Sequence, residues 1–335
     1  MSYESGSQAV EPNEMPDIRT GFITGVTFGP TAVQYEVVNG LAIFENDIVL
    51  GTVDEIEAET ALVRQEVPIA DLVVITGSRF RWTDGVVPWD IDPTLPNQAR
   101  VTNAIREWDT RTDLSFPQRT PANAASFPTW VTFRAGTPDC TSPAGRQGTG
   151  QQFINLDTDC TEGNVMHEIG HTVGLWHEQS RADRDLFVTI NFGNIQPGRE
   201  FNFSQHITDG DDFGDYDYGS IMHYGPTAFG VVNPVTGVQS TTITPTRPLP
   251  AGVTLGQRMA LSAGDVANVN GIYRCEHLRR VIARAQSAIS SLQAQLAGAS
   301  PSEKPGIIAR IREQREKIAG AERESAQLNC QRITA

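Results

Sequence analysis

Residues 167–177 read His-Glu-Ile-Gly-His-Thr-Val-Gly-Leu-Trp-His, and this stretch decides the fold and chemistry of the chain. Histidines four apart on a helix project from one face, so His167 and His171 can reach the same metal ion. Gly174 can adopt the left-handed conformation that ends a helix, and the turn returns His177 as a third nitrogen ligand. Three neutral imidazoles leave a tetrahedral zinc ion with one open position, which is typical of a catalytic site.

Glu168 lies on the same predicted helix, beside the metal but not bound to it. Zinc lowers the pKa of a bound water to roughly 7, and a carboxylate at this position can take the proton. The pattern uses three of the six histidines of the chain, whereas the alternative, a histidine satisfied by core packing, requires no such spacing. The motif therefore predicts zinc-dependent hydrolysis, with one zinc ion and Glu168 as general base.

Four further stretches extend the pattern. The chain continues Glu-Gln-Ser-Arg-Ala-Asp-Arg-Asp over residues 178–185 and reads Ser-Ile-Met-His-Tyr over residues 220–224. Downstream are Leu-Gly-Gln-Arg at residues 255–258 and Ile-Tyr-Arg-Cys at residues 272–275. Together with the histidine motif, these stretches resemble the astacin family of metzincin metalloendopeptidases, from about Arg81 to Cys275.

The resemblance implies a role for each matching residue. The three histidines are zinc ligands, and Glu168 is the base and later the proton donor to the leaving amine. Met222 forms an apolar floor beneath the histidines. Tyr224 is a mobile additional ligand that stabilises the tetrahedral intermediate, which suits a phenol hydroxyl; the alternative is an ordinary buried tyrosine. Glu178 receives the ammonium of the mature N-terminus, or else is a surface carboxylate.

The residues around the motif predict an α+β fold. Strands and one amphipathic helix precede the motif, and irregular sequence rich in glycine and proline follows it. The strands are expected at residues 86–91, 130–134 and 152–156, and the helix at residues 97–110. Thr161 can cap the zinc helix. The resemblance implies two lobes around a zinc cleft, a twisted mixed sheet with helices above and an irregular lobe below. An extended substrate then pairs with a sheet edge near residues 140–145.

Residues 1–76 precede the resemblance and are interpreted as a propeptide, with strand-like alternation at residues 22–26 and 33–37. Residues 44–47 read Phe-Glu-Asn-Asp, similar to the FxGD segment of astacin propeptides, whose aspartate binds the zinc. Asn46 replaces the glycine, but asparagine tolerates a left-handed backbone. The resemblance implies that Asp47 is the latch of a zymogen and the propeptide its intramolecular inhibitor; the alternative is an ordinary turn aspartate. Activation is expected by cleavage near residues 75–81.

The chain has four cysteines. Cys140 and Cys160 resemble the astacin disulfide that precedes the zinc helix. The family's second disulfide joins the position of Cys275 to an early cysteine, which residues 112–116 lack. Cys330 is the remaining cysteine, so a Cys275–Cys330 bridge is our hypothesis, with two free thiols as the alternative. Disulfides indicate an oxidising compartment, so we expect a secreted protein, although the first residues show no signal peptide.

Residues 277–335 follow the expected catalytic domain, which spans residues 77–276. Apolar residues recur every three or four positions over residues 278–296 and 307–328, and Pro301 and Pro305 lie in the break between them. This pattern predicts an antiparallel helical hairpin. We expect it to staple the catalytic domain; the alternative is a docking module on a catalytically latent, astacin-like binding protein.

Composition excludes several classes of function. A chain of 335 residues with a net charge of −14 is an unsuitable partner for nucleic acid. No apolar run is long enough to span a membrane. The acidic run at residues 209–217 offers oxygen ligands for calcium but lacks the EF-hand spacing, so we expect a solvated loop there. Protein or peptide substrates are the expected partners.

Overall fold

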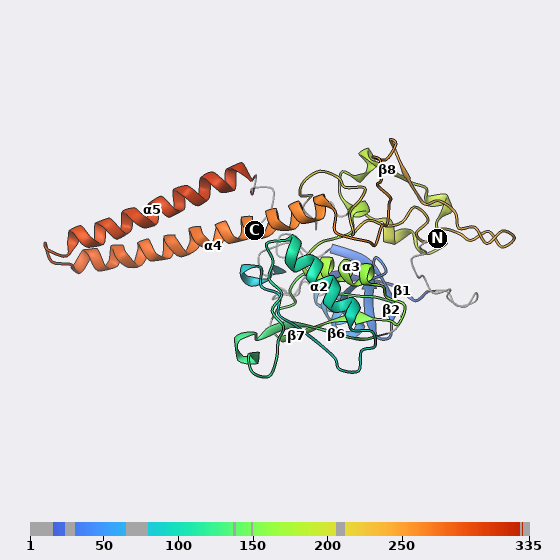
Figure 1. The fold of residues 1–335 in the computed structure, drawn as a ribbon, viewed down its shortest axis with the longest axis horizontal. Coiled ribbons are helices and arrows are strands. Elements are labelled where there is room, and N and C mark those ends of the chain that lie inside the picture. The colour runs from blue at the N-terminus through green and yellow to red at the C-terminus, as the bar shows by residue number, and fades with distance from the viewer. Residues whose placement is uncertain are drawn as a thin grey trace.

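The computed structural model describes residues 16–23, 31–64, 80–136, 139–148, 150–205, 212–328 and 330. Parts of three predictions lie outside these residues: the strand after Ile23, the cleavage region before residue 80 and the first residues of the acidic run. The described chain forms an N-terminal module, a two-lobed body and a long helical hairpin (Figure 1).

The N-terminal module, residues 16–23 and 31–64, is an antiparallel sheet covered by one helix. Its strands lie in the order β1-β2-β3-β4, with bounds β1 Ile18–Ile23, β2 Thr31–Val38, β3 Leu41–Phe44 and β4 Ile48–Thr52, and the helix is α1 Val53–Arg64. Asn39 and Gly40 both have positive φ, the backbone that a tight two-residue hairpin between β2 and β3 requires. Alternate residues of the strands face α1 and bury a core that includes Tyr35, Phe44 and Ile56.

The upper lobe packs two helices against a parallel sheet. The strands, in spatial order, are β5 Trp89–Ile91, β6 Thr129–Ala135 and β7 Gly150–Leu156. Thr141 adds an antiparallel bridge to Asn155, which gives the sheet its mixed edge. The helices are α2 Ala99–Arg111 and α3 Glu162–Thr172, and short 3₁₀ turns lie at η2 Thr83–Gly85 and η3 Ala124–Ser126. The expected α+β upper lobe is confirmed.

The lower lobe follows α3 and is mostly irregular, as the sequence predicts. Its regular elements are the two-stranded sheet of β8 Val188–Ile190 and β9 Ile243–Pro245, with 3₁₀ turns η4 Glu178–Ser180, η5 Arg184–Leu186, η6 Phe192–Asn194 and η7 Glu200–Phe203. A separate aromatic cluster holds the lobe together, including Phe203, Tyr216 and Tyr224. The zinc motif lies between the lobes because α3 ends where the lower lobe begins (Figure 1).

The C-terminal hairpin consists of α4 Ala263–Gly298 and α5 Lys304–Gln327, and it projects away from the body (Figure 1). α4 runs without interruption through residue 276, where we expected a domain boundary. Ser262 and Asp265 form a capping box at its start, and proline first appears beyond its end. The last helix of the body is therefore also the first helix of the hairpin.

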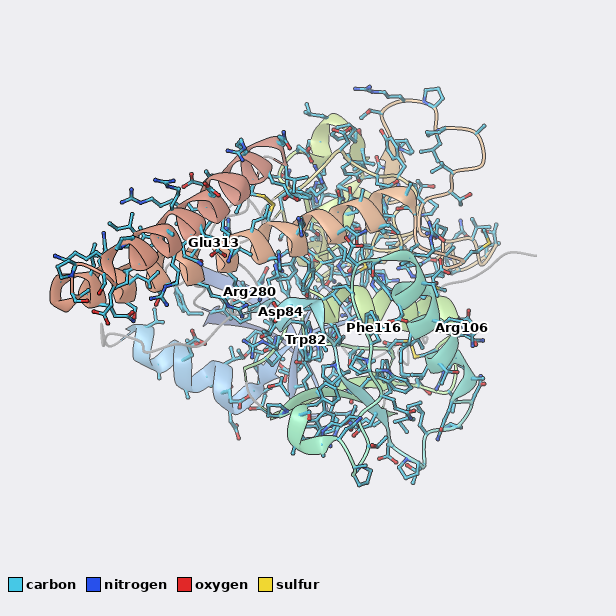
Figure 2. The ribbon with its side chains drawn as sticks, turned by 60° about the vertical axis from the view of Figure 1, so that its left-hand side comes forward. Trp82, Asp84, Arg106, Phe116, Arg280 and Glu313 are labelled. Atoms are coloured by element: carbon cyan, nitrogen blue, oxygen red, sulfur yellow. A yellow bond between two sulfur atoms is a disulfide. The ribbon has the colours of Figure 1, made fainter. Side chains whose placement is uncertain are left out.

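The base of the hairpin touches the first described residues of the upper lobe (Figure 2). Arg280 on α4 forms an ion pair with Asp84 at 3.3 Å. Trp82 is 1 % exposed and its indole N–H donates to the Thr172 carbonyl at 2.9 Å. The start of the domain is thus fixed to both α4 and α3. No helix within the described ranges has the length and apolarity needed to cross a bilayer.

Candidate metal centre

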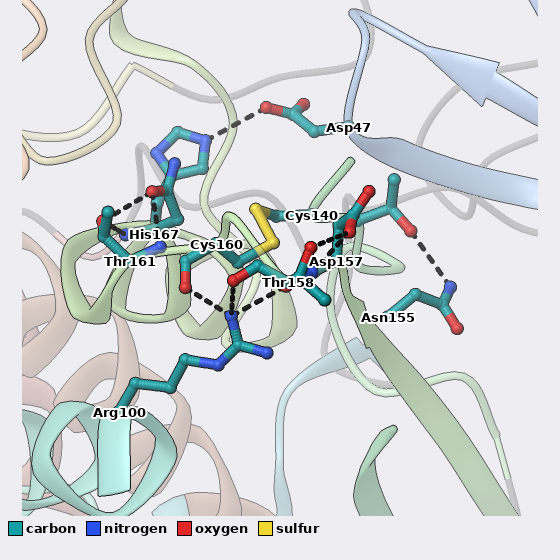
Figure 3. Close-up of a disulfide and its surroundings, with 11 residues drawn as sticks. Asp47, Arg100, Cys140, Asn155, Asp157, Thr158, Cys160, Thr161 and His167 are labelled. Carbon is teal, nitrogen blue, oxygen red and sulfur yellow. Dashed lines mark hydrogen bonds and ion pairs between the residues drawn. A yellow bond between two sulfur atoms is a disulfide. The ribbon is translucent and has the colours of Figure 1, made fainter. Parts of the chain in front are cut away.

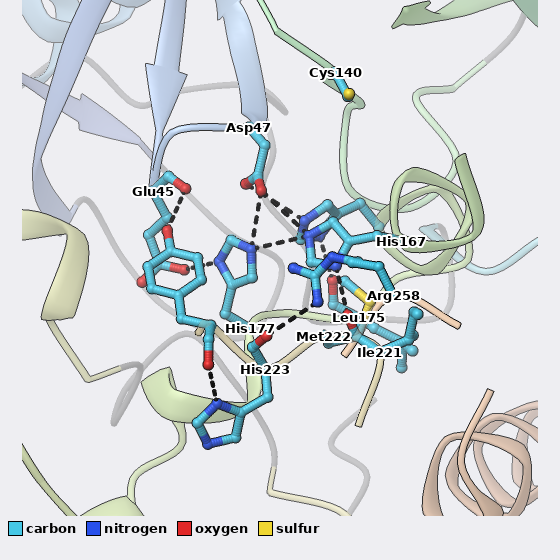
Figure 4. A network of polar contacts seen from close by, with 12 residues as sticks. Glu45, Asp47, Cys140, His167, Leu175, His177, Ile221, Met222, His223 and Arg258 are labelled. Atoms are coloured by element: carbon cyan, nitrogen blue, oxygen red, sulfur yellow. Dashed lines mark hydrogen bonds and ion pairs between the residues drawn. The ribbon is translucent and has the colours of Figure 1, made fainter. Parts of the chain in front are cut away.

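Four side chains converge at the boundary between the lobes: His167, His171, His177 and Asp47 (Figure 4). All are buried, and their candidate ligand atoms lie within 4.8 Å of one another. Asp47 Oδ2 lies 3.2 Å from Nε2 of both His167 and His177, and Asp47 Oδ1 lies 3.5 Å from Nε2 of His171. Asp47 comes from the turn between β3 and β4, so the N-terminal module reaches into the cluster.

Each histidine is oriented by a hydrogen bond from its other ring nitrogen. The Nδ1–H of His167 donates to the Ile221 carbonyl at 2.8 Å, and that of His171 donates to the Leu175 carbonyl at 2.9 Å. A carbonyl accepts only, so the proton is on Nδ1 and the Nε2 lone pair points into the cluster. His177 donates its Nδ1–H to the Glu45 carboxylate of the N-terminal module at 2.8 Å.

The local sequence explains why α3 presents this face. Thr161 and Asn164 cap its start reciprocally, as predicted for Thr161. Gly170 lies against Met222, whose Sδ would be only 2.4 Å from a Cβ at that position, so the helix rests directly on the sulfur. Gly174 has a φ of 97° and ends the helix, which lets the chain return toward His177.

The cluster fits a zinc ion. His171 Nε2 and Asp47 Oδ1 are buried without a hydrogen-bond partner among the described residues. The Nε2 atoms of His167 and His177 face each other at 3.2 Å, an arrangement that a cation between them satisfies. Three imidazole nitrogens with one carboxylate form a donor set that zinc prefers. Burial lowers the pKa of His177, but Asp47 and Glu45 outweigh it and raise the pKa to about 9, so metal and proton compete there.

Glu168 lies on α3 and is 2 % exposed. Its Oε2 has no hydrogen-bond partner in the described part of the chain. Burial, followed by the nearby Asp47 charge, raises the pKa of Glu168 well above its ordinary value, and Arg258 opposes this rise. A buried carboxyl with raised pKa, next to a metal cluster, is suited to exchange protons with a reacting water.

Tyr224 lies beside the cluster with its ring centroid 4.5 Å from that of His177. Its hydroxyl donates to the backbone carbonyl of Glu45 at 2.6 Å. Burial raises the pKa of the phenol well above its ordinary value, so the group is a donor at neutral pH. The N-terminal module therefore holds the hydroxyl that the resemblance assigns to the metal and the reaction intermediate.

Glu178 follows His177 and is buried among residues of the lower lobe. One oxygen accepts a hydrogen bond from the Asp217 backbone N–H at 2.7 Å, and Arg181 lies 3.8 Å away. Burial dominates over the Arg181 charge and raises the pKa of Glu178 to about 8. The structure thus places a poorly compensated carboxyl beside the third histidine rather than on the surface.

The Cys140–Cys160 disulfide joins the rim above the cluster to the residue before the cap of α3 (Figure 3). Arg100 supports the same corner, because its guanidinium donates to the carbonyls of Asp157 and Cys160. The rim is the edge where the sequence predicts substrate pairing. There Ser142 N–H donates to the Asp47 carbonyl at 3.0 Å, so the N-terminal module occupies that edge.

The sequence reasoning missed two residues at the cluster. Glu45 contacts His177 directly, although it was read only as the variable position of a four-residue motif. Arg258 is partly buried nearby and donates to the carbonyls of His223 and Gln257 at 3.1 and 3.0 Å. Arg258 is the last residue of the Leu-Gly-Gln-Arg stretch at residues 255–258, which we used only to mark the end of the domain.

Comparisons with known proteins agree with this geometry. The model of the Astacin peptidase family matches residues 74–274. A bone morphogenetic protein 1 homolog from Strongylocentrotus purpuratus is 36% identical over 218 residues, which cover 63% of this chain and 33% of that protein. Tolloid-like protein 2 from Mus musculus is 39% identical over 201 residues, which cover 58% of this chain and 19% of that protein.

A solved structure matches as well. High choriolytic enzyme 1, a hatching enzyme zinc-protease from Oryzias latipes, superposes with a TM-score of 0.50 and 32% identity. The match covers 61% of this chain and 98% of the other. By contrast, this chain spans a third or less of the two curated relatives above. The similarity is therefore to one domain of those longer proteins.

Proposed function

Because this chain belongs to the astacin family and is a zinc metalloendopeptidase, we propose that it is a latent proenzyme that hydrolyses peptide bonds in proteins after its propeptide is removed. The observation that carries the proposal is the Asp47 carboxylate, whose Oδ2 lies 3.2 Å from the Nε2 atoms of His167 and His177. A carboxylate is a good zinc ligand, so it takes the position that a water needs. We place the propeptide through about residue 76, the catalytic domain at residues 77–276 and the hairpin beyond.

The residues of the chain then divide the reaction between them. His167, His171 and His177 would hold the zinc ion, joined by Tyr224 in the mature enzyme, and zinc supplies Lewis acidity that lowers the pKa of water to roughly 7. Glu168 takes the proton from the attacking water and passes it to the departing amine. Met222 supports the histidines from below.

Removal of the propeptide also changes Tyr224 and Glu178. The Tyr224 hydroxyl loses the Glu45 carbonyl and becomes available to a developing oxyanion. Cleavage near residues 75–81 creates an ammonium that can reach Glu178. The raised pKa of Glu178, about 8 from burial, supports this role, because a buried carboxyl of this kind is stabilised by a new positive partner.

The two disulfides support a secreted protein, because such bonds persist in oxidising compartments. Protein or peptide substrates are the proposed partners, with an extended chain pairing at the rim of residues 140–145. The propeptide is the intramolecular inhibitor. Zinc is the one metal required. The described part of the acidic run, residues 212–217, contains no helix or strand and has no assigned ion.

The test is the variant Asp47→Ala in the uncleaved, zinc-loaded chain, assayed on casein. We expect clear hydrolysis, whereas the unaltered chain stays latent until cleaved. Asp54→Asn on α1, away from the cluster, is the matched control and should stay latent. A fully latent Asp47→Ala chain would refute the latch. Loss of all activity even after complete propeptide removal would instead favour a catalytically latent binding protein.

A further inference from the structure

We propose that the N-terminal module is a folded inhibitor that stays bound to the catalytic domain after the chain is cut between residues 65 and 79. Cutting alone then leaves the enzyme latent, and activation requires a second event that removes or destroys the module. The inference rests on the proposed function, because it needs an activity to inhibit. Its partner is the catalytic domain of the same chain or of a second copy.

The module has the parts of a self-supporting unit. Four paired strands and α1 enclose an apolar core that includes Ile23, Tyr35, Ile48 and Ile56, each 4 % exposed or less. The ion pairs on its surface also join residues within the module, since Arg19 pairs with both Asp17 and Glu57. A segment that becomes ordered only on binding binds more weakly, because ordering costs conformational entropy. A module that is already folded does not have this cost, since it keeps its shape when it is released.

The turn between β3 and β4 presents two carboxylates instead of one (Figure 4). Glu45 Oε2 accepts the Nδ1–H of His177 at 2.8 Å, and Glu45 Oε1 accepts the Ser180 hydroxyl at 2.6 Å. Glu45 is 0 % exposed. Positive φ values at Glu45 and Asn46, 46° and 76°, aim both acidic side chains at the catalytic domain. Three contacts, including the one from Tyr224 to the Glu45 carbonyl, are thus independent of Asp47.

The module also contacts both lobes. On the upper side, Ser142 exchanges backbone hydrogen bonds with Asp47 and Val49 at 3.0 and 3.1 Å. On the lower side, both terminal nitrogens of the Arg199 guanidinium donate to the Glu36 carboxylate, and both side chains are largely buried. Such bidentate pairs are among the stronger polar contacts. Contacts to both lobes hold the inhibitory turn in place without help from the chain connection.

Apolar packing completes the interface. The Phe44 ring meets Trp176 edge-on with centroids 5.9 Å apart, and Ala144 of the rim packs into the core of the module. Before cleavage, the connection supplies a high effective concentration of the module. After cleavage, inhibition depends on the concentration of the two pieces. The proposal therefore predicts a latent complex that becomes active on dilution.

The experiment places a site-specific protease sequence between residues 66 and 74 of the full-length, zinc-loaded chain. After complete cutting, the pieces are run on size exclusion at micromolar concentration and assayed on a quenched fluorescent peptide. We expect co-elution and latency, with activity that rises on dilution. Separate elution of the pieces would overturn the proposal, and so would co-elution with full activity, because a bound module would then not be an inhibitor.

Variants locate the binding contacts. Glu45→Ala and Glu36→Ala each remove one partner of a buried charged contact, which should weaken the cut complex about 30-fold or more. Glu57→Ala, an exposed residue paired within the module, is the matched control and should leave binding unchanged. Equal binding by all three variants would overturn the assigned interface. If the purified catalytic piece cleaves no peptide after activation trimming and zinc loading, the proposed function fails, while co-elution still reports binding.

Discussion

The Glu45 carboxylate accepts the Nδ1–H of His177 at 2.8 Å, so the N-terminal module supplies the outer hydrogen bond of a residue in the metal cluster. The equivalent acceptors for His167 and His171 are carbonyls of the catalytic domain itself. Outer partners of this kind fix the ring orientation and raise the basicity of the ligand nitrogen. Under the proposed activation, the third histidine is therefore the one whose surroundings change most.

Glu45→Ala in the uncleaved chain should weaken zinc binding, because His177 loses the acceptor that orients it. Loss of an outer-shell partner typically lowers metal affinity about 10- to 100-fold. Competition with a chromophoric chelator measures the effect without any activity assay. Glu57→Ala is the control, and equal zinc affinity for the two variants would show that Glu45 does not orient the ring.

Glu168→Gln should abolish peptide hydrolysis in the activated enzyme while zinc stays bound. The amide cannot accept the proton of the attacking water, and loss of a general base typically lowers the rate about 10²- to 10⁴-fold. Steady-state hydrolysis of a peptide and metal analysis of the same sample check both parts. Retained turnover above a tenth of the unaltered rate would contradict the assignment of the base.

The pKa of Glu178 predicts how the stability of the uncleaved chain changes with pH. Burial raises this pKa from its ordinary 4.5 to about 8. Between these values the folded protein holds a proton that the unfolded chain has released, so this group's contribution to stability falls as pH rises through the window. Glu178→Gln carries no titrating proton and should lose this dependence.

Urea unfolding at pH 5 and pH 8 measures the effect. The free energy of unfolding is compared at the two pH values. On going from pH 5 to pH 8, that of Glu178→Gln should rise by on the order of 3 kcal/mol relative to that of the unaltered chain. Asp185→Asn, on the exposed end of the same segment, is the control and should show little change. Parallel pH dependence in Glu178→Gln and the unaltered chain would mean that Glu178 is already ionised in the uncleaved chain.

Local patterns predicted the parts of the site that lie close together in sequence. The spacing of His167 and His171 places both on one face of α3, and the left-handed Gly174 follows from the same eleven residues. The lower lobe was predicted as irregular because glycine and proline interrupt it. These features depend on backbone preferences within one or two turns, which the sequence states directly.

Long-range contacts could not be predicted in the same way. Glu45 and His177 are 132 residues apart, and no periodicity links them. The sheet of the N-terminal module requires pairing of four strands, of which the sequence showed strand-like alternation only at residues 22–26 and 33–37. We placed the start of the hairpin too late, at residue 277, because the family resemblance ends inside α4. The helix begins after its cap at Ser262.

The Cys275–Cys330 disulfide leads to the last prediction, because it joins α4 to the residues after α5 and closes the base of the hairpin. The bridge encloses a segment with a sequence separation of 55. Restricting a loop of this length in the unfolded chain stabilises the folded protein by about 2–4 kcal/mol. Cys275 is 0 % exposed and Cys330 2 % exposed, so both lie in the main core rather than at its surface.

Paired substitution of Cys275 and Cys330 by serine should therefore lower the melting temperature by several degrees, about 2–4 °C per kcal/mol in a domain of this size. The hairpin projects away from the body (Figure 1), so peptide hydrolysis by the activated variant should stay within about twofold at low temperature. Calorimetry and a peptide assay on the same sample separate the two effects. An unchanged melting temperature would show that the hairpin is held by its packing alone, and a large loss of turnover would show that it contributes to the site.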